Sequence, residues 1–199
     1  DFSSFNMPYE LVIEAINDLP VIKQPKLNEG IMVLTDIKSD PYPGSSVVPA
    51  YCRATFDRRT LVGETKESVL EPIINCLNEL EKNDSTIIAK ASYAEGSNLC
   101  YTKKELSAEK FFPAWLFDEN EDFVQACLSQ LNKDGFNPQV TVYDFCTNGS
   151  YYAGEKGIKT IGLGPSKENL AHTIDEYIFI DQLIGASNSY LSILKALMK

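Results

Sequence analysis

Several residue types and patterns that would point to a function are scarce in this sequence. Its 199 residues include one histidine and one tryptophan. No apolar run approaches the roughly 20 residues that a transmembrane helix needs. The 18 basic residues are outnumbered by 28 acidic ones, for a formal net charge of -10, and Arg58-Arg59 is the only adjacent arginine pair. Because nucleic acids and anionic membranes bind clustered lysine and arginine, neither is expected as a partner.

The cysteines follow no metal-binding or disulfide pattern. They are Cys52, Cys76, Cys100, Cys127 and Cys146, an odd number without a C-x-x-C pair. Reduced thiols in a cytoplasmic protein fit this spacing best. The chain begins at Asp1 with neither a signal peptide nor an initiator methionine, which predicts that an upstream segment has been removed or belongs to another chain.

The first half of the chain predicts the order helix, strand, strand, helix, strand. The expected elements are a helix at 6–20, paired strands at 31–38 and 50–57, a helix at 65–80 and a strand at 86–93. Asn6 and Thr65 are the expected N-caps of the two helices. This order is that of a ferredoxin-like unit without its first strand. Because that strand is central in the sheet, the other strands are expected to have unpaired edges.

The second half predicts a different α/β unit. The expected elements are a helix at 120–131, strands at 140–145 and 157–163, and a helix at 181–198 with Leu183, Ser187, Tyr190, Leu194 and Leu197 at helical spacing. Residues 96–113 are the expected link, with Phe111, Phe112 and Trp115 packing the junction. The predicted domains are 1–107 and 108–199. The fold class is α/β, with strands missing from both units.

The single histidine follows a glycine turn. The sequence is Gly162-Leu163-Gly164-Pro165, then Ala171-His172-Thr173-Ile174-Asp175-Glu176-Tyr177. A lone histidine is more often a surface or structural residue, but imidazole is also the commonest side-chain ligand of metals. Cys146, the other reactive side chain nearby, is expected to be a small buried hydrophobe at a strand end rather than a nucleophile.

The histidine motif resembles the C-terminal metal-ligand motif of the co-catalytic zinc aminoacylase and carboxypeptidase family. Members include acetylornithine deacetylase, succinyl-diaminopimelate desuccinylase and carboxypeptidase G. Further segments agree in order and spacing: Val47-Val48-Pro49, Asp57-Arg58-Arg59-Thr60, Gly63-Glu64-Thr65, Phe112-Pro113-Ala114-Trp115 and Phe145-Cys146-Thr147-Asn148-Gly149. The combination is most similar to the branch of hydrolases associated with selenium metabolism.

The resemblance implies a fold and an arrangement of parts. In that family a ferredoxin-like lid domain interrupts a catalytic α/β domain. The chain then corresponds to the lid without its first strand, followed by the C-terminal part of the catalytic domain. The remaining metal ligands and the general base of the family would lie in a missing N-terminal catalytic segment. No catalytic residue is therefore expected in this chain, which alone is expected to be inactive.

The resemblance also assigns roles to individual residues. His172 would bind metal, and Glu176 would contact this ligand without binding the metal itself. Arg59 would grip a substrate carboxylate with its planar donor fork, while Arg58 should point to the opposite face of the strand. Further substrate contacts are expected at Ser46, where many relatives carry asparagine, and at Asn148, Gly149 and Gly164.

The function implied for the intact protein is metal-dependent amide hydrolysis. The expected substrates are N-acyl amino acids or short peptides, and the expected cofactor is two zinc ions, with cobalt or manganese as alternatives. The lid is expected to form a homodimer. The alternative is a non-catalytic module that mediates dimerisation or binds a small metabolite.

Overall fold

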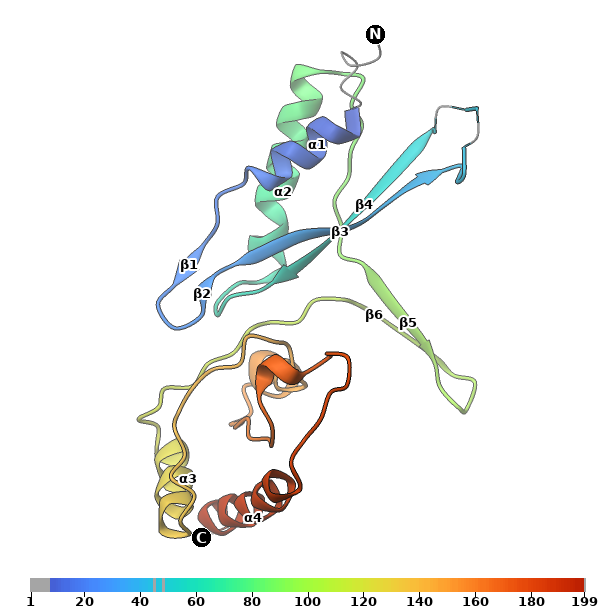
Figure 1. The fold of residues 1–199 in the computed structure, drawn as a ribbon. Helices are drawn as coiled ribbons and strands as arrows, with labels where there is room; N and C mark the ends of the chain where they lie inside the picture. The colour runs from blue at the N-terminus through green and yellow to red at the C-terminus, as the bar shows by residue number, and fades with distance from the viewer. Residues whose placement is uncertain (1–7, 45, 48, 199) are drawn as a thin grey trace. The chain divides into compact units, whose positions relative to one another are not determined.

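The computed structural model describes residues 8–44, 46–47 and 49–198, so the predicted cap Asn6 and the motif residue Val48 lie outside the described residues. The chain divides into two compact units, Asp1–Ala114 and Trp115–Lys199. Helices and small antiparallel sheets make it a mixed α/β protein, which confirms the predicted fold class (Figure 1). The functional domains 1–107 and 108–199 stay a prediction. Among the described helices, none combines the length and apolar character needed to cross a membrane.

The first unit contains two helices that pack against each other, α1 (Pro8–Asn17) and α2 (Lys66–Asn83). Thr65 caps α2 as predicted: its hydroxyl accepts a hydrogen bond from the Ser68 N–H at 3.2 Å, and the Ser68 hydroxyl accepts one from the Thr65 N–H at 2.9 Å. Val69 and Leu77 are the buried residues of α2. Helix α2 is therefore encoded locally by its cap and its apolar spacing.

A long antiparallel ribbon lies between the helices in sequence. It pairs β3 (Ile31–Asp40) with β4 (Tyr51–Arg59), from Ile31 opposite Arg59 to Asp40 opposite Tyr51, which confirms the predicted pairing. A bulge interrupts the register between Leu34 and Asp36. The extra residue, Thr35, donates its hydroxyl to the Thr55 carbonyl at 3.1 Å. A small hairpin of β1 (Lys23–Gln24) and β2 (Asn28–Glu29), which the sequence did not predict, precedes the ribbon.

The strand predicted at 86–93 is wrong in one respect. Residues 87–94 have no regular structure, but their side chains alternate as in a strand: Ile87 is buried and Ile88 is 85% exposed. No partner strand pairs with this segment within the described part of the chain. Side-chain contacts hold it instead, because the Tyr93 hydroxyl donates to the Lys66 carbonyl at 2.8 Å and the Ala89 N–H donates to the Glu81 carboxylate at 2.9 Å.

The predicted link at 96–113 is also corrected. It holds a hairpin of β5 (Glu95–Leu99) and β6 (Glu105–Glu109). The Cys100 carbonyl accepts the Lys103 N–H at 2.8 Å, and Lys103 has a left-handed φ of 63°. Neither residue is typical of a hairpin turn, which explains why the sequence did not predict this one. An ion pair between Lys66 and Glu109 ties the hairpin to α2.

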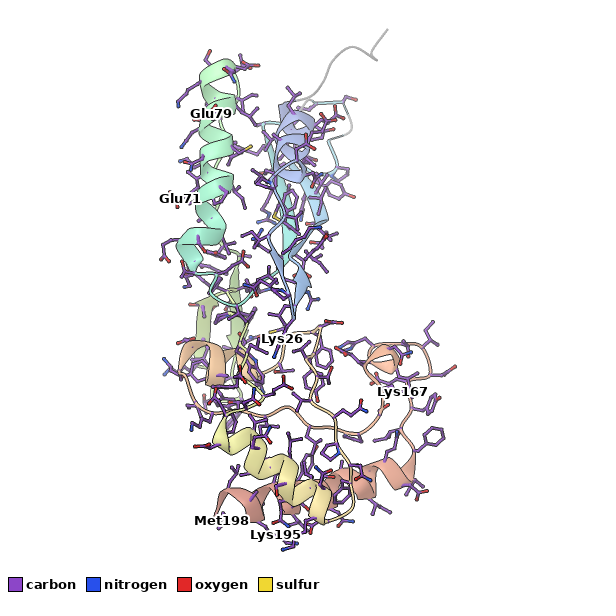
Figure 2. All side chains as sticks on the ribbon, turned by 90° about the vertical axis from the view of Figure 1, so that its left-hand side faces the viewer. Lys26, Glu71, Glu79, Lys167, Lys195 and Met198 are labelled. Atoms are coloured by element: carbon purple, nitrogen blue, oxygen red, sulfur yellow. The ribbon has the colours of Figure 1, made fainter. Side chains whose placement is uncertain are left out.

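The second unit is built on two helices, α3 (Asp122–Lys133) and α4 (Ile180–Leu197), that pack together. Both were predicted, but the residues that the sequence placed at helical spacing on α4 are not its buried ones. The buried residues of α4 are Ala186, Ser189 and Ser192, whereas Leu183, Ser187, Tyr190, Leu194 and Leu197 are exposed. Small side chains allow close helix packing, and α3 takes that face. The exposed end of α4 carries Lys195 and Met198 (Figure 2).

The strands predicted at 140–145 and 157–163 are not formed. Both segments lack regular structure, because neither pairs with a strand among the described residues. A single π-helix, Ser150–Glu155, lies between them. Cys146, expected to be buried, is exposed, and all five cysteines are free thiols. The two unpaired segments nevertheless contact each other, as described below.

We expect the stability of the α3–α4 pair to depend on pH. The Ser192 hydroxyl donates to Asp134 at 2.6 Å, and this bond, then one from Gln130 and the charge of Lys195, lower the pKa of the Asp134 carboxyl. A lowered pKa in the folded state contributes stability above the unfolded value, which is lost as pH falls through the folded value. Asp134→Asn should therefore flatten the decline in melting temperature between neutral pH and about pH 3, unlike Asp144→Asn at an exposed position. Parallel pH profiles for the wild type and Asp134→Asn would contradict this.

Candidate functional site

His172 lies in an exposed loop that is held by local hydrogen bonds. Its backbone is left-handed, with φ of 62°, and Asp175 follows with φ of 59°. The His172 N–H donates to the Glu176 carboxylate at 3.0 Å, and the Ser166 hydroxyl donates to the Tyr177 carbonyl at 3.3 Å. Left-handed backbone is unfavourable for residues with a Cβ, so these contacts offset a local cost. The loop thus presents the imidazole in a defined backbone conformation.

Glu176 acts on the backbone of His172. Its carboxylate accepts the His172 N–H, at the distance given above. A carboxylate that orients a metal-bound histidine commonly does so through the second ring nitrogen. In the structure, Glu176 therefore holds the backbone of the loop and not the imidazole ring. The role itself stays a prediction.

Asn148 and Gly149 lie in a turn at the start of the π-helix. The Asn148 carbonyl accepts the N–H groups of Tyr151 at 3.1 Å and Tyr152 at 3.2 Å, and the Thr147 hydroxyl accepts the Gly149 N–H at 3.1 Å. Asn148 is exposed, whereas Gly149 is buried. π-Helical turns occur frequently at functional sites. The asparagine side chain is thus presented at the surface by a turn with defined hydrogen bonding.

The segments before Asn148 and before His172 lie side by side. The Asp144 N–H donates to the Glu168 carboxylate at 2.8 Å. The ring of Tyr143 lies so close to Gly162 that a Cβ there would clash with its Cε2. The Leu163 carbonyl accepts the Tyr190 hydroxyl of α4 at 3.1 Å. The second unit therefore brings together the two segments that carry Asn148, Gly164 and His172.

Gly164 has no such contact. A Cβ built on it would meet nothing within 4 Å. Neither close approach nor a left-handed backbone requires glycine at this position, so a plain turn accounts for it. Its predicted substrate contact stays a prediction.

Arg58 and Arg59 point to different surroundings, as predicted for neighbours on a strand. Arg58 donates to the Glu64 carboxylate at 2.5 Å, and Glu64 has only 6% of its side chain exposed. Arg59 is half exposed and forms a looser ion pair with Asp57, with 3.4 Å between Nε and Oδ2. Exposed pairs of this kind contribute between 0 and about 1 kcal/mol, so a substrate carboxylate could displace Asp57. Ser46, in the loop between β3 and β4, is exposed.

The described residues do not form a metal site by themselves. No group of three or more histidine, cysteine, aspartate or glutamate side chains gathers among them. A dinuclear zinc site needs several nitrogen and oxygen ligands for each ion. His172 could supply one of them, so the residues of this chain fit a single ligand and not the whole centre.

Two features near the predicted residues were missed at the sequence level. Glu64 is the buried partner of Arg58, although the sequence placed it only at a helix start. Trp115 lies against Gly149, with 2.6 Å between its Cζ2 and the position of a Cβ there. Opposite charges six residues apart across a turn are a sequence signal for the pairing of Arg58 with Glu64. No local signal relates Trp115 to Gly149.

The comparison with known protein families concerns the first unit. Residues 6–85 match the model of the peptidase dimerisation domain of the M20 family, which is of the ferredoxin-like lid type. The chain is 29% identical over 168 residues to the uncharacterised protein YgeY of Escherichia coli strain K12, and equally to YgeY of Escherichia coli O157:H7.

Each alignment covers 84% of this chain and 40% of the relative, so the chain spans less than half the length of the curated relatives it matches. No solved structure matches the chain. The dimerisation-domain match concerns residues 6–85, and both relatives are described as uncharacterised.

Proposed function

We propose that the chain is the lid and the C-terminal part of the catalytic domain of a metal-dependent amidohydrolase. The match of residues 6–85 to a peptidase dimerisation domain carries this proposal. The intact protein hydrolyses amide bonds of N-acyl amino acids or short peptides in the cytoplasm and forms a homodimer through the lid. The similarity to the selenium-associated branch of hydrolases names no substrate.

His172 contributes one ligand of a dinuclear zinc centre in this proposal. The exposed loop and the Glu176 contact support this role, because both fix the backbone from which the imidazole projects. The other ligands and the general base come from a segment outside this chain. The 199-residue chain alone is accordingly inactive.

Arg59 reads the substrate carboxylate, with Ser46, Asn148, Gly149 and Gly164 as further contacts. The half-exposed guanidinium with its loose Asp57 pair supports this assignment, because an exposed ion pair is easily exchanged for another carboxylate. Arg58 cannot serve as the matched control, since its ion pair with Glu64 is largely buried. Arg53 can, because it is exposed and lies an even number of residues from Arg59 on the same strand.

We expect Arg59→Ala to raise the KM for an N-acetyl amino acid by roughly 10- to 100-fold, the worth of charge-assisted hydrogen bonds to a carboxylate. The assay follows release of the free amino acid by the protein that includes the upstream catalytic segment, with zinc, cobalt or manganese added. Arg53→Ala should match the wild type. An Arg59→Ala protein with an unchanged KM would remove this residue from substrate binding.

The alternative function is a non-catalytic module for dimerisation or metabolite binding. The missing ligand cluster favours it for this chain taken alone. The two functions differ in one measurement. A protein that binds N-acetyl amino acids but releases no product with any of the three metals would be the module and not the hydrolase.

A further inference from the structure

The indole of Trp115 occupies the space where any other residue at position 149 would place its side chain. A Cβ on Gly149 would lie 2.6 Å from Cζ2 and 2.7 Å from both Cε2 and Nε1 of the ring. Gly149 has an ordinary right-handed backbone, with φ of −56° and ψ of −28°. Its glycine is therefore required by close approach and not by an unusual backbone conformation.

Trp115 is itself held by a row of aromatic rings. Its ring centroid lies 6.0 Å from that of Phe117, whose ring meets Phe123 edge-on at 5.2 Å and an interplanar angle of 88°. Phe123 is buried in the first turn of α3. Aromatic contacts of this geometry are favourable beyond the area they bury. The position of the indole is thus set by a helix of the second unit.

The placement of Asn148 depends on that of Gly149. Its carbonyl accepts two backbone N–H groups from the π-helix, while the Gly149 N–H is bound by the Thr147 hydroxyl. A displacement of Gly149 away from the indole would therefore disturb these bonds. Tyr143 lies in a similar way against Gly162, in a segment without regular structure.

We propose that Trp115 is a positioning residue for the Asn148 turn. The indole fixes this turn through a glycine that leaves no room for a side chain. The role of Asn148 as a substrate contact rests on the proposed function. The contact through which the Trp115 ring fixes the turn is independent of that function.

Amide hydrogen exchange of the 199-residue chain tests the coupling. Gly149→Ala should speed exchange at the Tyr151 and Tyr152 amides by about 10-fold or more, and leave the amides of α3 within about 2-fold of the wild type. Gly185→Ala is the matched control, because a Cβ on that α4 glycine meets nothing within 4 Å. The fluorescence of Trp115, the only tryptophan, should change in Gly149→Ala and not in Gly185→Ala.

A compensating pair gives the sharper result. Phenylalanine at position 115 lacks the Cζ2 and Nε1 atoms nearest to Gly149, so Trp115→Phe should restore slow exchange at Tyr151 and Tyr152 when combined with Gly149→Ala. Additive effects of the two substitutions would overturn the proposal. So would a uniform rise in exchange across the second unit, or no rise at all in Gly149→Ala.

Binding of N-acetyl-L-alanine separates this proposal from the proposed function. It is measured by calorimetry on the protein with its upstream segment. Weaker binding in Gly149→Ala, rescued by Trp115→Phe, supports both. If the wild type does not bind the probe while the exchange results hold, the choice of substrate fails and the positioning role of Trp115 stands.

Discussion

Glu64→Ala is expected to destabilise the first unit by roughly 3 kcal/mol, the cost of leaving one member of a largely buried ion pair without its partner. Glu64 accepts two hydrogen bonds, from Arg58 at 2.5 Å and from the Leu61 N–H at 2.6 Å. Its removal leaves both donors without this acceptor in a region that solvent barely reaches. Thermal unfolding should show a fall in melting temperature of about 10 °C or more.

The environment of Arg58 makes this cost large. Its side chain is 26% exposed and also approaches the Met32 sulfur at 4.0 Å, while its Nε is buried with no partner in the described structure. Glu71→Ala, an exposed glutamate of α2 (Figure 2), should change stability by less than about 0.5 kcal/mol. Replacing both charges, as Arg58→Met with Glu64→Leu, should recover most of the loss. Equal melting temperatures for Glu64→Ala and Glu71→Ala would show that the ion pair is not stabilising.

His172→Ala is expected to lower the metal affinity of the intact protein by more than about 100-fold. Loss of an outer partner of a ligand already costs about 10- to 100-fold, and loss of the ligand should cost more. Metal content after dialysis at a fixed free zinc concentration measures this without reference to activity. A protein with His172→Ala that keeps its full metal content would exclude His172 from the ligand set.

Two variants separate the imidazole from its loop. Glu176→Ala removes the acceptor of the His172 N–H and should weaken metal binding by about 10-fold, whereas Glu176→Gln retains a carbonyl oxygen and should have a smaller effect. Lys167→Ala, at an exposed position in the same loop (Figure 2), is the control and should bind metal like the wild type. A larger loss of metal affinity in Glu176→Ala than in His172→Ala would contradict the assignment of His172 as the ligand.

The elements that the sequence predicted correctly are those with local signals. Thr65 with Ser68 three residues later is a cap, and the apolar spacing of α2 and α3 is helical. The segments predicted wrongly as strands, 140–145 and 157–163, have strand-like composition but need a partner from elsewhere to form a ladder. Pairing is a property of two segments, so composition alone cannot establish it.

The candidate site shows the same division between local and distant information. The alternation of Arg58 and Arg59 follows from the period of a strand and was predicted. The contacts of Trp115 with Gly149 and of Tyr143 with Gly162 join residues 19 or more positions apart, and no spacing rule relates them. Sequence motifs therefore indicated the candidate residues, while the packing around their turns depends on contacts between segments distant in the sequence.

On the exposed side of α4, the large apolar residues affect solubility and stability differently. Buried aliphatic side chains stabilise a fold because they are removed from water. Leu183, Leu191 and Leu194 are more than half exposed and gain little of this. Polar replacements at these positions should leave the α3–α4 contact intact and raise the concentration at which the chain stays in solution. On this helix, solubility is controlled by the large residues and stability by the small ones.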